Sequence, residues 1–365
     1  MIKVLHVFNQ LNQGGIEHVV INLMKNIDRS EIEFHFALMS GKEGLLDAEV
    51  RQLGGHIHYF TSGKKGVINV GKNLSNIIDK YGPFEVVHSH SYFFSGYILY
   101  IAKMKGVPIR IAHAHDTYKG EKTSFIRKIY ESGMQYLINK NSTYKLGVSA
   151  EACLHVFGKI DDTTFIVNNA IDLENYKLNN EIRNKKRTEL RISNDEKLII
   201  NIGRFEDQKD HEYLIDVFSK LLERTKNFKL LLIGNGSLKE NVINKVKRLG
   251  FSKKVLFLEN RNDINELLMA ADIFLMTSKY EGLPIVLIEA QAAGIPCIIS
   301  SNITHDAVIG KNVYSLKKDK INDWVDKTMA LRNTARMDNS LALKDAGFDI
   351  KEVASFVQEL YLSKK

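Results

Sequence analysis

The sequence predicts an α/β protein with two doubly wound parallel sheets. Short runs rich in β-branched residues alternate with longer amphipathic stretches, which is the pattern of stacked βαβ units. The 365 residues, 44% of them hydrophobic and 26% charged, are enough for more than one core. A polar, highly charged stretch divides the strand-like runs into two sets. We therefore expect two domains of similar size.

The predicted domains follow from the order of these runs. Residues 1–172 hold seven of them, enough for a complete sheet: IKVLHVF, EFHFALM, HIHYF, EVVHSH, RIAHAH, YKLGVS and TFIVNNA. Residues 173–195 are expected to be a linker. Residues 196–348 hold a second set: LIINIG, KLLLIG, VLFLE, IFLMT, PCIIS and NVYSL. Residues 349–365 are expected to form a terminal helix with one apolar stripe that must pack on another part of the chain.

Helix signals support the second domain. In HEYLIDVFSKLLERT the apolar residues Leu214, Ile215, Phe218, Leu221 and Leu222 share one face. Asp210 precedes this stretch and is expected to be its N-cap.

The composition argues against several classes of protein. The two cysteines, Cys153 and Cys297, lack metal-binding spacing and form no disulfide framework. No run reaches the roughly 20 apolar residues of a membrane span, and the first residues lack the features of a secretory signal. We expect a cytoplasmic protein. The net charge of +8 is spread along the chain, which favours phosphates or acidic lipid over nucleic acid as partners.

Open α/β sheets bind ligands beyond the carboxyl ends of their strands, so the loops there are the candidate sites. Gly14 and Gly15 precede a helix, and backbone N–H groups there can approach an anion, although a plain tight turn is the alternative. Arg204 and Lys209 follow the strand LIINIG. Two cations on one loop suit a diphosphate, whereas simple surface solvation is the alternative. In IGNGSLKE, Asn235 stands between two glycines that would also allow close ligand approach.

Two glutamates surround the start of a short predicted helix, residues 284–293. Pro284 suits its first turn, and Gly294 lies just past its end. Glu281 lies on the preceding loop, whereas Glu289 lies more than one turn inside, where it needs polar partners. A carboxylate accepts two hydroxyl donors at once, so sugar hydroxyls are suitable partners.

At this point the chain resembles the retaining family-four glycosyltransferases of the GT-B fold, most closely the bacterial subgroup of capsular and exopolysaccharide synthesis. The resemblance covers nearly the whole chain and rests on Arg-x4-Lys, on Glu-x7-Glu in EGLPIVLIE, on the glycine pair and on ADIFLMTSKYEGLP. It implies two Rossmann-like domains facing across a cleft, with the terminal helix returning to the first. It also implies transfer of a hexose from a nucleotide sugar, expected to be a UDP-sugar, to a growing polysaccharide. No metal ion or other cofactor is expected.

The resemblance gives each site residue a role. Glu289 would bind the ribose of the donor, and Glu281 would contact its hexose. Arg204 and Lys209 would hold the diphosphate and stabilise the charge that develops as the glycosidic bond breaks. The other donor-binding positions would be Gly14, Gly15, Asn235, Gly282, Leu283 and Pro284.

A histidine is also expected to contact the donor sugar. His115, in RIAHAHDTYKG, is the best alignment with the family pattern. His113 is the competing alignment, because alternation puts both rings on the same side of an extended strand. His88 and His90 are expected to be buried structural residues.

The acceptor side is predicted in the first domain. Residues 116–140 mix aromatic and basic side chains, and such a helix could rest on an anionic membrane surface, where lipid-linked saccharides reside. This would make the protein peripheral on the inner face of the plasma membrane; an ordinary solvated helix face is the alternative. Two rival functions stay open at this point, a nucleotide-sugar epimerase and a two-lobed sugar-binding protein without enzymatic activity.

Overall fold

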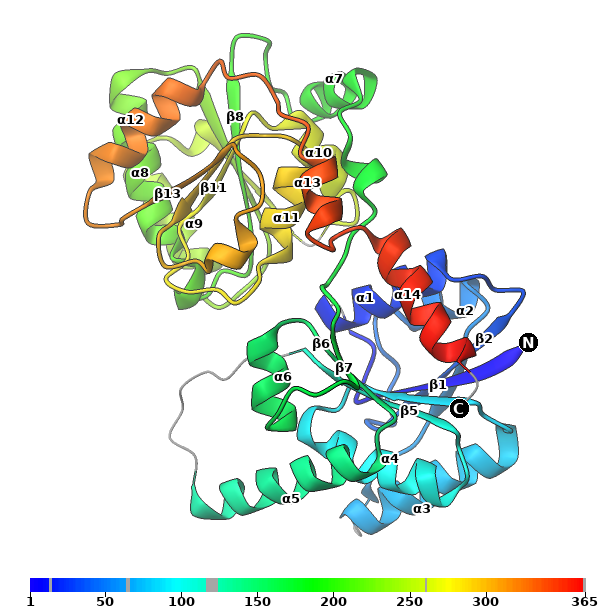
Figure 1. Cartoon of the computed structure of the whole chain (residues 1–365). Coiled ribbons are helices and arrows are strands. Elements are labelled where there is room, and N and C mark those ends of the chain that lie inside the picture. The colour runs from blue at the N-terminus through cyan, green and yellow to red at the C-terminus, as the bar shows by residue number, and fades with distance from the viewer. Residues whose placement is uncertain (13–14, 64–65, 116–123, 260, 364–365) are drawn as a thin grey trace. The chain divides into compact units, whose positions relative to one another are not determined.

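The computed structural model describes residues 1–12, 15–63, 66–115, 124–259 and 261–363. The chain forms two compact units (Figure 1). The first contains Met1–Ile171 and Asp349–Lys365, and the second contains Asp172–Phe348. Each unit has its own parallel sheet and its own apolar cores.

The sheet of the first unit has, within the described residues, seven parallel strands in the order β3-β2-β1-β4-β5-β6-β7. The order reverses beside β1, as in a doubly wound fold. Each strand lies within or overlaps one of the seven predicted runs, so this part of the prediction is confirmed. The strands are β1 Ile2–Phe8, β2 Ile32–Leu38, β3 His56–Tyr59, β4 Val86–Ser89, β5 Ile109–Ala114, β6 Tyr144–Gly147 and β7 Thr164–Ile166.

Helices cover both faces of this sheet because its strands are apolar on both sides. The terminal helix α14 belongs to this unit, where Val353, Val357 and Leu360 join the same apolar core as β1 and α1. The helices are α1 Gly15–Asn26, α2 Asp47–Gln52, α3 Gly66–Tyr81, α4 Ser95–Met104, α5 Phe125–Asn141, α6 Ala150–Phe157 and α14 Ile350–Leu362, with a 3-10 turn η2 at Tyr92–Phe94.

The second unit has six parallel strands among its described residues, in the order β10-β9-β8-β11-β12-β13. They correspond to the six predicted runs. The strands are β8 Lys197–Ile202, β9 Phe228–Ile233, β10 Val255–Leu258, β11 Ile273–Met276, β12 Cys297–Ser300 and β13 Val313–Leu316. The helices are α7 Asn180–Glu189, α8 His211–Arg224, α9 Lys239–Arg248, α10 Ile264–Ala270, α11 Ile285–Ala292, α12 Ile321–Leu331 and α13 Ser340–Asp345. The 3-10 turns are η3 Leu173–Tyr176, η4 Asp207–Lys209, η5 Ser252–Lys254 and η6 His305–Ala307.

Helix α8 forms as its sequence predicts. The five apolar residues of its predicted face are all buried. Asp210 is its N-cap, and the Asp210 carboxylate accepts a hydrogen bond from the Tyr213 amide at 3.3 Å.

The stretch predicted as a linker, residues 173–195, contains η3 and α7 and is anchored to the second unit. Arg183 donates to the carbonyl oxygens of Met269, Ala270 and Ala271, which close helix α10, at 2.8, 3.0 and 2.9 Å. The charges that suggested a solvated linker therefore bind the free carbonyls at a helix end. The carboxylate of Asp272 holds this arrangement together, because it pairs with both Arg183 and Arg187.

We predict that Asp272→Ala lowers the free energy of unfolding of the second unit by roughly 2–4 kcal/mol, because it leaves the buried Arg187 guanidinium without its carboxylate. The substitution also removes the acceptor of the Leu198 amide, at 2.7 Å. Urea unfolding measures the effect. Asp326→Ala is the matched control, since it breaks the Arg224–Asp326 pair on the exposed surface and should cost under about 0.5 kcal/mol. Equal losses in the two variants would contradict the anchoring role.

Candidate active site

The loops after β8 and β9 pack against each other through their backbones. The Gly203 amide donates to the Ile233 carbonyl at 2.9 Å, and the Phe205 amide donates to the Asn235 carbonyl at 2.9 Å. Gly234 has a φ of 144°, and a Cβ there would lie 2.2 Å from the Gly203 oxygen, so only glycine fits. The loops that carry Arg204 and Asn235 are therefore fixed side by side at the carboxyl end of the sheet.

Lys209 and Glu281 form an ion pair between two of these loops. The Lys209 Nζ lies 2.6 Å from Glu281 Oε1, and the two side chains are 16% and 8% exposed. The stem of Lys209 crosses Gly203, where a Cβ would lie 3.2 Å from Lys209 Cδ. The ammonium group is thus held by its stem and by its partner. Residues that are 72 positions apart in the chain meet here.

Arg204 differs from Lys209 in its surroundings. Its side chain is exposed and forms no ion pair with any residue that the structure describes. Its charge helps to hold the pKa of the Glu206 carboxyl below the ordinary value, after the larger effect of hydrogen bonds from Ser237. The guanidinium group is therefore free to bind an anion, whereas the ammonium of Lys209 already has a partner.

Gln208 is a site residue that the sequence did not reveal. Its Nε2 donates to Glu281 Oε2 at 3.3 Å and to the Tyr280 carbonyl at 3.0 Å. The Gln208 carbonyl accepts from the Lys279 amide at 2.8 Å. Gln208 therefore orients the second oxygen of the same carboxylate that Lys209 binds. Its position next to Lys209 was the one available signal.

Helix α11 begins with no side chain capping its N-terminus. Pro284 is its N-cap in an extended conformation, φ −76° and ψ 106°, rather than a residue of the first turn as predicted. The difference arises because Pro284 keeps its carbonyl for the Leu287 amide, at 3.0 Å, while its own ψ stays outside the helical range. Gly282 is exposed and Leu283 is partly buried just before it. The uncapped end carries partial positive charge beside Glu281.

Glu289 lies inside α11 and has Tyr176 as its partner. The Tyr176 hydroxyl donates to Glu289 Oε1 at 2.6 Å. Burial raises the pKa of Glu289 to about 7, and the hydrogen bond from Tyr176 opposes this shift. Burial and the nearby Glu289 carboxylate raise the pKa of Tyr176. Tyr176 comes from η3, within the stretch predicted as a linker, and so was missed as a site residue.

The remaining predicted residues belong to the first unit. Gly14 lies outside the described residues, and Gly15 begins α1. His115 directly follows β5 and is partly exposed, whereas His113 is 2% exposed. His88 and His90 are buried, as predicted. The structure therefore brings together Arg204, Lys209, Asn235 and Glu281 with the start of α11 in one unit, and places His115 and Gly15 in the other.

Groups that could share a metal ion occur, among the residues described, in the first unit and not around Glu281 or Glu289. They are His6 with His88 and His90, His90 with His113 and His115, and Glu33 with His35 and His56.

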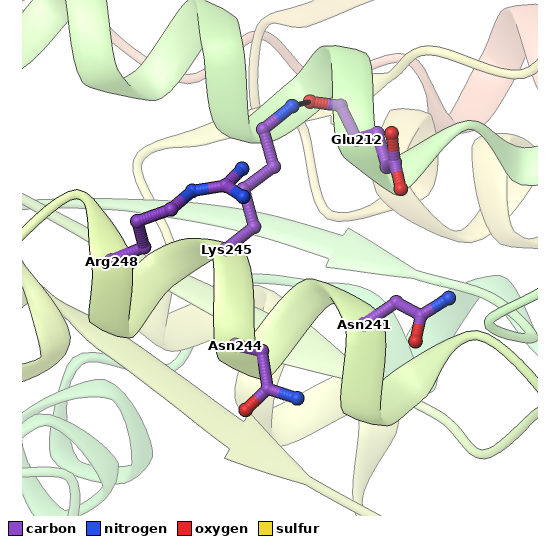
Figure 2. A pocket seen from close by; sticks show the side chains of 5 residues that line it. All are labelled: Glu212, Asn241, Asn244, Lys245 and Arg248. Carbon is purple, nitrogen blue, oxygen red and sulfur yellow. Dashed lines mark hydrogen bonds between the residues drawn. The ribbon is translucent and has the colours of Figure 1, made fainter.

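A polar cavity of about 420 Å³ lies between α8 and α9, on the outer helical layer of the second unit (Figure 2). It is lined by Glu212, Asn241, Asn244, Lys245 and Arg248. The Lys245 Nζ bridges the two helices by donating to the Glu212 carbonyl at 2.9 Å. None of the predicted site residues lines this cavity, so it is separate from the candidate site.

Comparison with known proteins finds glycosyltransferases that match both units of the chain. A family model described as "Glycosyltransferase Family 4" matches residues 13–175, and one described as "Glycosyl transferases group 1" matches residues 182–341. The putative glycosyltransferase EpsF of Bacillus subtilis is 33% identical over 89% of this chain and 86% of its own length. The capsular polysaccharide biosynthesis glycosyltransferase CapH of Staphylococcus aureus is 29% identical over 100% of this chain and 99% of its own.

A solved structure supports the fold. HepE of Anabaena, in complex with UDP and glucose, has a TM-score of 0.78 at 18% identity, covering 100% of both chains. Its likeness agrees with the two parallel sheets of seven and six strands. Together with the two family models and the identity to EpsF, these features show that the chain belongs to glycosyltransferase family 4 and has the GT-B fold.

Proposed function

We propose that this glycosyltransferase moves a hexose from a UDP-sugar to a growing, lipid-linked polysaccharide, with retention of configuration at the anomeric carbon and without a metal ion. The observation that carries the proposal is the Lys209–Glu281 ion pair beside the unpaired Arg204. Its similarity to EpsF and CapH supports a role in capsule or exopolysaccharide synthesis. The presence of UDP and glucose with HepE supports the choice of donor.

The diphosphate of the donor is the group that Arg204 and Lys209 suit best. A guanidinium grips two phosphate oxygens, whereas an ammonium acts as a point charge. Departure of a nucleoside diphosphate concentrates negative charge on the leaving oxygen. Cations that are already in place stabilise this charge without reorganising. The uncapped start of α11, with the amides of Gly282 and Leu283, adds further positive character.

Glu281 has two parts in this proposal. In the free protein it offsets the charge of Lys209 at 2.6 Å and keeps the ammonium in position. When the diphosphate approaches, Lys209 gains a second anionic partner, and Glu281 can accept hydrogen bonds from the hexose hydroxyls. Gln208 holds the other carboxylate oxygen and so keeps the carboxylate oriented during the exchange. His115 is proposed to hydrogen-bond the same sugar.

Glu289 is proposed to bind the ribose. Two ribose hydroxyls donate to a carboxylate only in its ionised form, and each such bond favours ionisation. In the free protein burial keeps the pKa of Glu289 near 7, so part of the population is protonated. Nucleotide binding should therefore release a proton.

In the transfer step that we propose, the departing phosphate accepts the proton of the incoming hydroxyl on the same face of the sugar. This leaves no role for a separate protein nucleophile.

Helix α5 supports a membrane-bound acceptor. Its C-terminal half packs on α4, but its first turns expose Phe125 and Ile126, 77% and 80% exposed, together with Ile129 and Tyr130. Arg127 and Lys128 lie among these apolar residues. Exposed apolar side chains mixed with cations suit an anionic lipid surface. No helix in the described part of the chain is long and apolar enough to cross a membrane. The exposed face of α5 supports the peripheral membrane contact that we propose on the cytoplasmic side.

We predict that Lys209→Ala lowers kcat roughly a hundred- to a thousandfold, because one preorganised cation at the leaving group is lost. Release of UDP from a UDP-sugar in the presence of acceptor measures turnover. Lys318→Ala is the matched control, since it breaks the neighbouring Lys318–Asp210 pair, whose lysine is about as buried as Lys209, without removing a proposed ligand of the diphosphate. The control should lose stability but keep most of its activity. Full activity of Lys209→Ala would end the assignment.

We predict that UDP-sugars raise Tm more than GDP- or ADP-sugars do, because a ligand that binds only the folded state stabilises it. A larger Tm shift with GDP-sugars would overturn the choice of UDP.

We also predict that the affinity for UDP-sugars rises about tenfold from pH 6 to pH 8 as Glu289 ionises. In Glu289→Gln this pH dependence should disappear. Without ligand, the folded chain holds the Glu289 proton more tightly than the unfolded chain. The stability that this protonation supplies is therefore present at low pH and lost as the pH rises from 4.5 to about 7.

We predict that Ile126→Asp weakens binding to vesicles containing acidic lipid, because it places a charge in the face that would insert. Vesicle sedimentation at low and high salt measures the effect. Ile68→Asp is the control, since Ile68 is similarly exposed, at 74%, on α3 of the same unit. Equal binding by both variants, or no binding by the unaltered protein, would argue for an ordinary solvated helix.

A further inference from the structure

Five histidines and one tyrosine form a network in the first unit, and all of them except the partly exposed His115 are buried. Its members come from three adjacent strands, the residues that follow two of them, and the terminal helix. Aromatic rings surround it, with Phe8 stacked on His90 at 4.3 Å and Phe34 on His6 at 5.4 Å between ring centroids. The members are His6 of β1, His88 and His90 of β4 and its end, His113 and His115 of β5 and its end, and Tyr361 of α14.

The hydrogen bonds form one unbranched chain with Tyr361 in the middle. On one side, Tyr361 Oη lies 3.3 Å from His6 Nε2, His6 Nδ1 lies 3.0 Å from His90 Nε2, and His90 Nδ1 lies 2.8 Å from His115 Nε2. On the other side, Tyr361 Oη lies 2.7 Å from His88 Nδ1, and His88 Nε2 lies 3.2 Å from His113 Nδ1. The chain ends at His115 Nδ1 and His113 Nε2, which are buried and have no hydrogen-bond partner among the described residues.

All five rings are neutral at physiological pH. Burial lowers the pKa of His6 and of His113 to about 3. The pKa values of His88, His90 and His115 are also held well below 6.5, chiefly by burial. A neutral imidazole has one N–H donor and one acceptor nitrogen, so each ring can donate in only one direction along the chain.

Every link between two of these rings joins an Nδ1 to an Nε2. If one ring carries its proton on Nδ1, its neighbours must do the same for each link to have one donor and one acceptor. The Tyr361 hydroxyl donates to one of the two rings that it contacts, His6 and His88, and accepts from the other. The donor-to-acceptor direction is therefore the same in both halves of the chain. All five rings must therefore share one tautomer. One end of the chain then presents a donor, and the other presents an acceptor.

A bound metal ion explains the geometry less well. A metal lies in the plane of each ring that coordinates it, so the lone pairs of its ligands must converge. His113 and His115 are stacked, with centroids 4.0 Å apart and an angle of 29° between planes, and His88 is stacked on His113 at 13°. The lone pairs of stacked rings lie in separate, nearly parallel planes, which hinders their convergence on one ion. The three ring-to-ring hydrogen bonds also occupy nitrogens that a metal would need.

We propose that Tyr361 is a positioning residue for His115: its hydroxyl joins the two halves of the chain, so that the tautomer of His115, and with it the offer of a donor or an acceptor, is tied to the tautomers of the other four rings. This rests on the proposed function insofar as His115 contacts the donor sugar. A sugar hydroxyl can both donate and accept, so a ring with a fixed tautomer selects one orientation of that hydroxyl. The terminal helix thereby contributes to the site without touching the ligand.

The tautomers can be read directly from the ¹⁵N shifts of histidine side chains in the full-length protein. We expect His6, His88, His90, His113 and His115 to show the same tautomer. Tyr361→Phe should change the tautomer populations at His115 and His113, neither of which contacts Tyr361. A purely local packing role would change only His6 and His88. Tyr213→Phe is the control, because it removes a hydroxyl that has no partner among the described residues.

Different tautomers among the five histidines of the unaltered protein would contradict the proposed hydrogen-bond chain. Stoichiometric binding of Zn²⁺ that changes the ¹⁵N shifts of these histidines would also contradict it. In turnover, Tyr361→Phe should lower kcat about three- to tenfold at unchanged KM. In a His115→Ala background the same change should cost nothing further, because the two residues act together. Additive losses would overturn the positioning role. The Lys209 variants test the proposed function separately, since they leave the tautomers unchanged.

Discussion

The ion pair between Lys209 and Glu281 is the interaction on which the candidate site depends. It joins Lys209, the last residue of the 3-10 turn η4 after β8, to Glu281, which precedes α11 and forms an isolated β-bridge with Ile303. Removing two charges from water is costly, and the cost is offset here by close approach and by the hydrogen bond from Gln208. The packing of Gly234 on Gly203 fixes the neighbouring loop as well. The Lys209 ammonium is therefore held in place, whereas the Arg204 side chain stays exposed.

Glu289 differs from Glu281 in its hydrogen-bond partner and in the effect of burial on its pKa. Its partner is an uncharged hydroxyl, so burial is not offset by an opposite charge and the carboxyl retains affinity for a proton. The two glutamates therefore differ in kind: Glu281 pairs with a cation, whereas Glu289 accepts a hydrogen bond from a neutral hydroxyl. Glu281 precedes α11, whereas Glu289 lies within this helix, and each has a distinct environment.

The sequence predicted the strands well because parallel strands buried on both faces are continuous apolar runs, as in β8 and β11. It singled out Lys209 and Glu281 as candidate site residues, and the structure shows that their side chains form an ion pair. It did not predict Tyr176 or the anchoring of Arg183. Both lie in a polar stretch whose partners are carbonyls and a carboxylate about 90 to 110 positions away, and composition carries no information about such partners. Pro284 was placed one position too far into its helix, since proline fixes φ but not ψ.

The histidine chain follows from strand register. Side chains two residues apart lie on the same face of a strand, so the runs VLHVF, VVHSH and RIAHAH each place their histidines on one face. In the parallel register His6 pairs with His88, and His88 pairs with Ile111. The observed bonds from His6 to His90 and from His88 to His113 are therefore each displaced by two residues toward the carboxyl end. Each of these links joins an Nδ1 to an Nε2, and the order of the two nitrogens is reversed in the link between His88 and His113. The histidines come from three neighbouring strands and the residues that follow them, whereas Tyr361 comes from α14. Its hydroxyl joins the His6–His90–His115 half of the chain to the His88–His113 half, which strand register alone would leave separate.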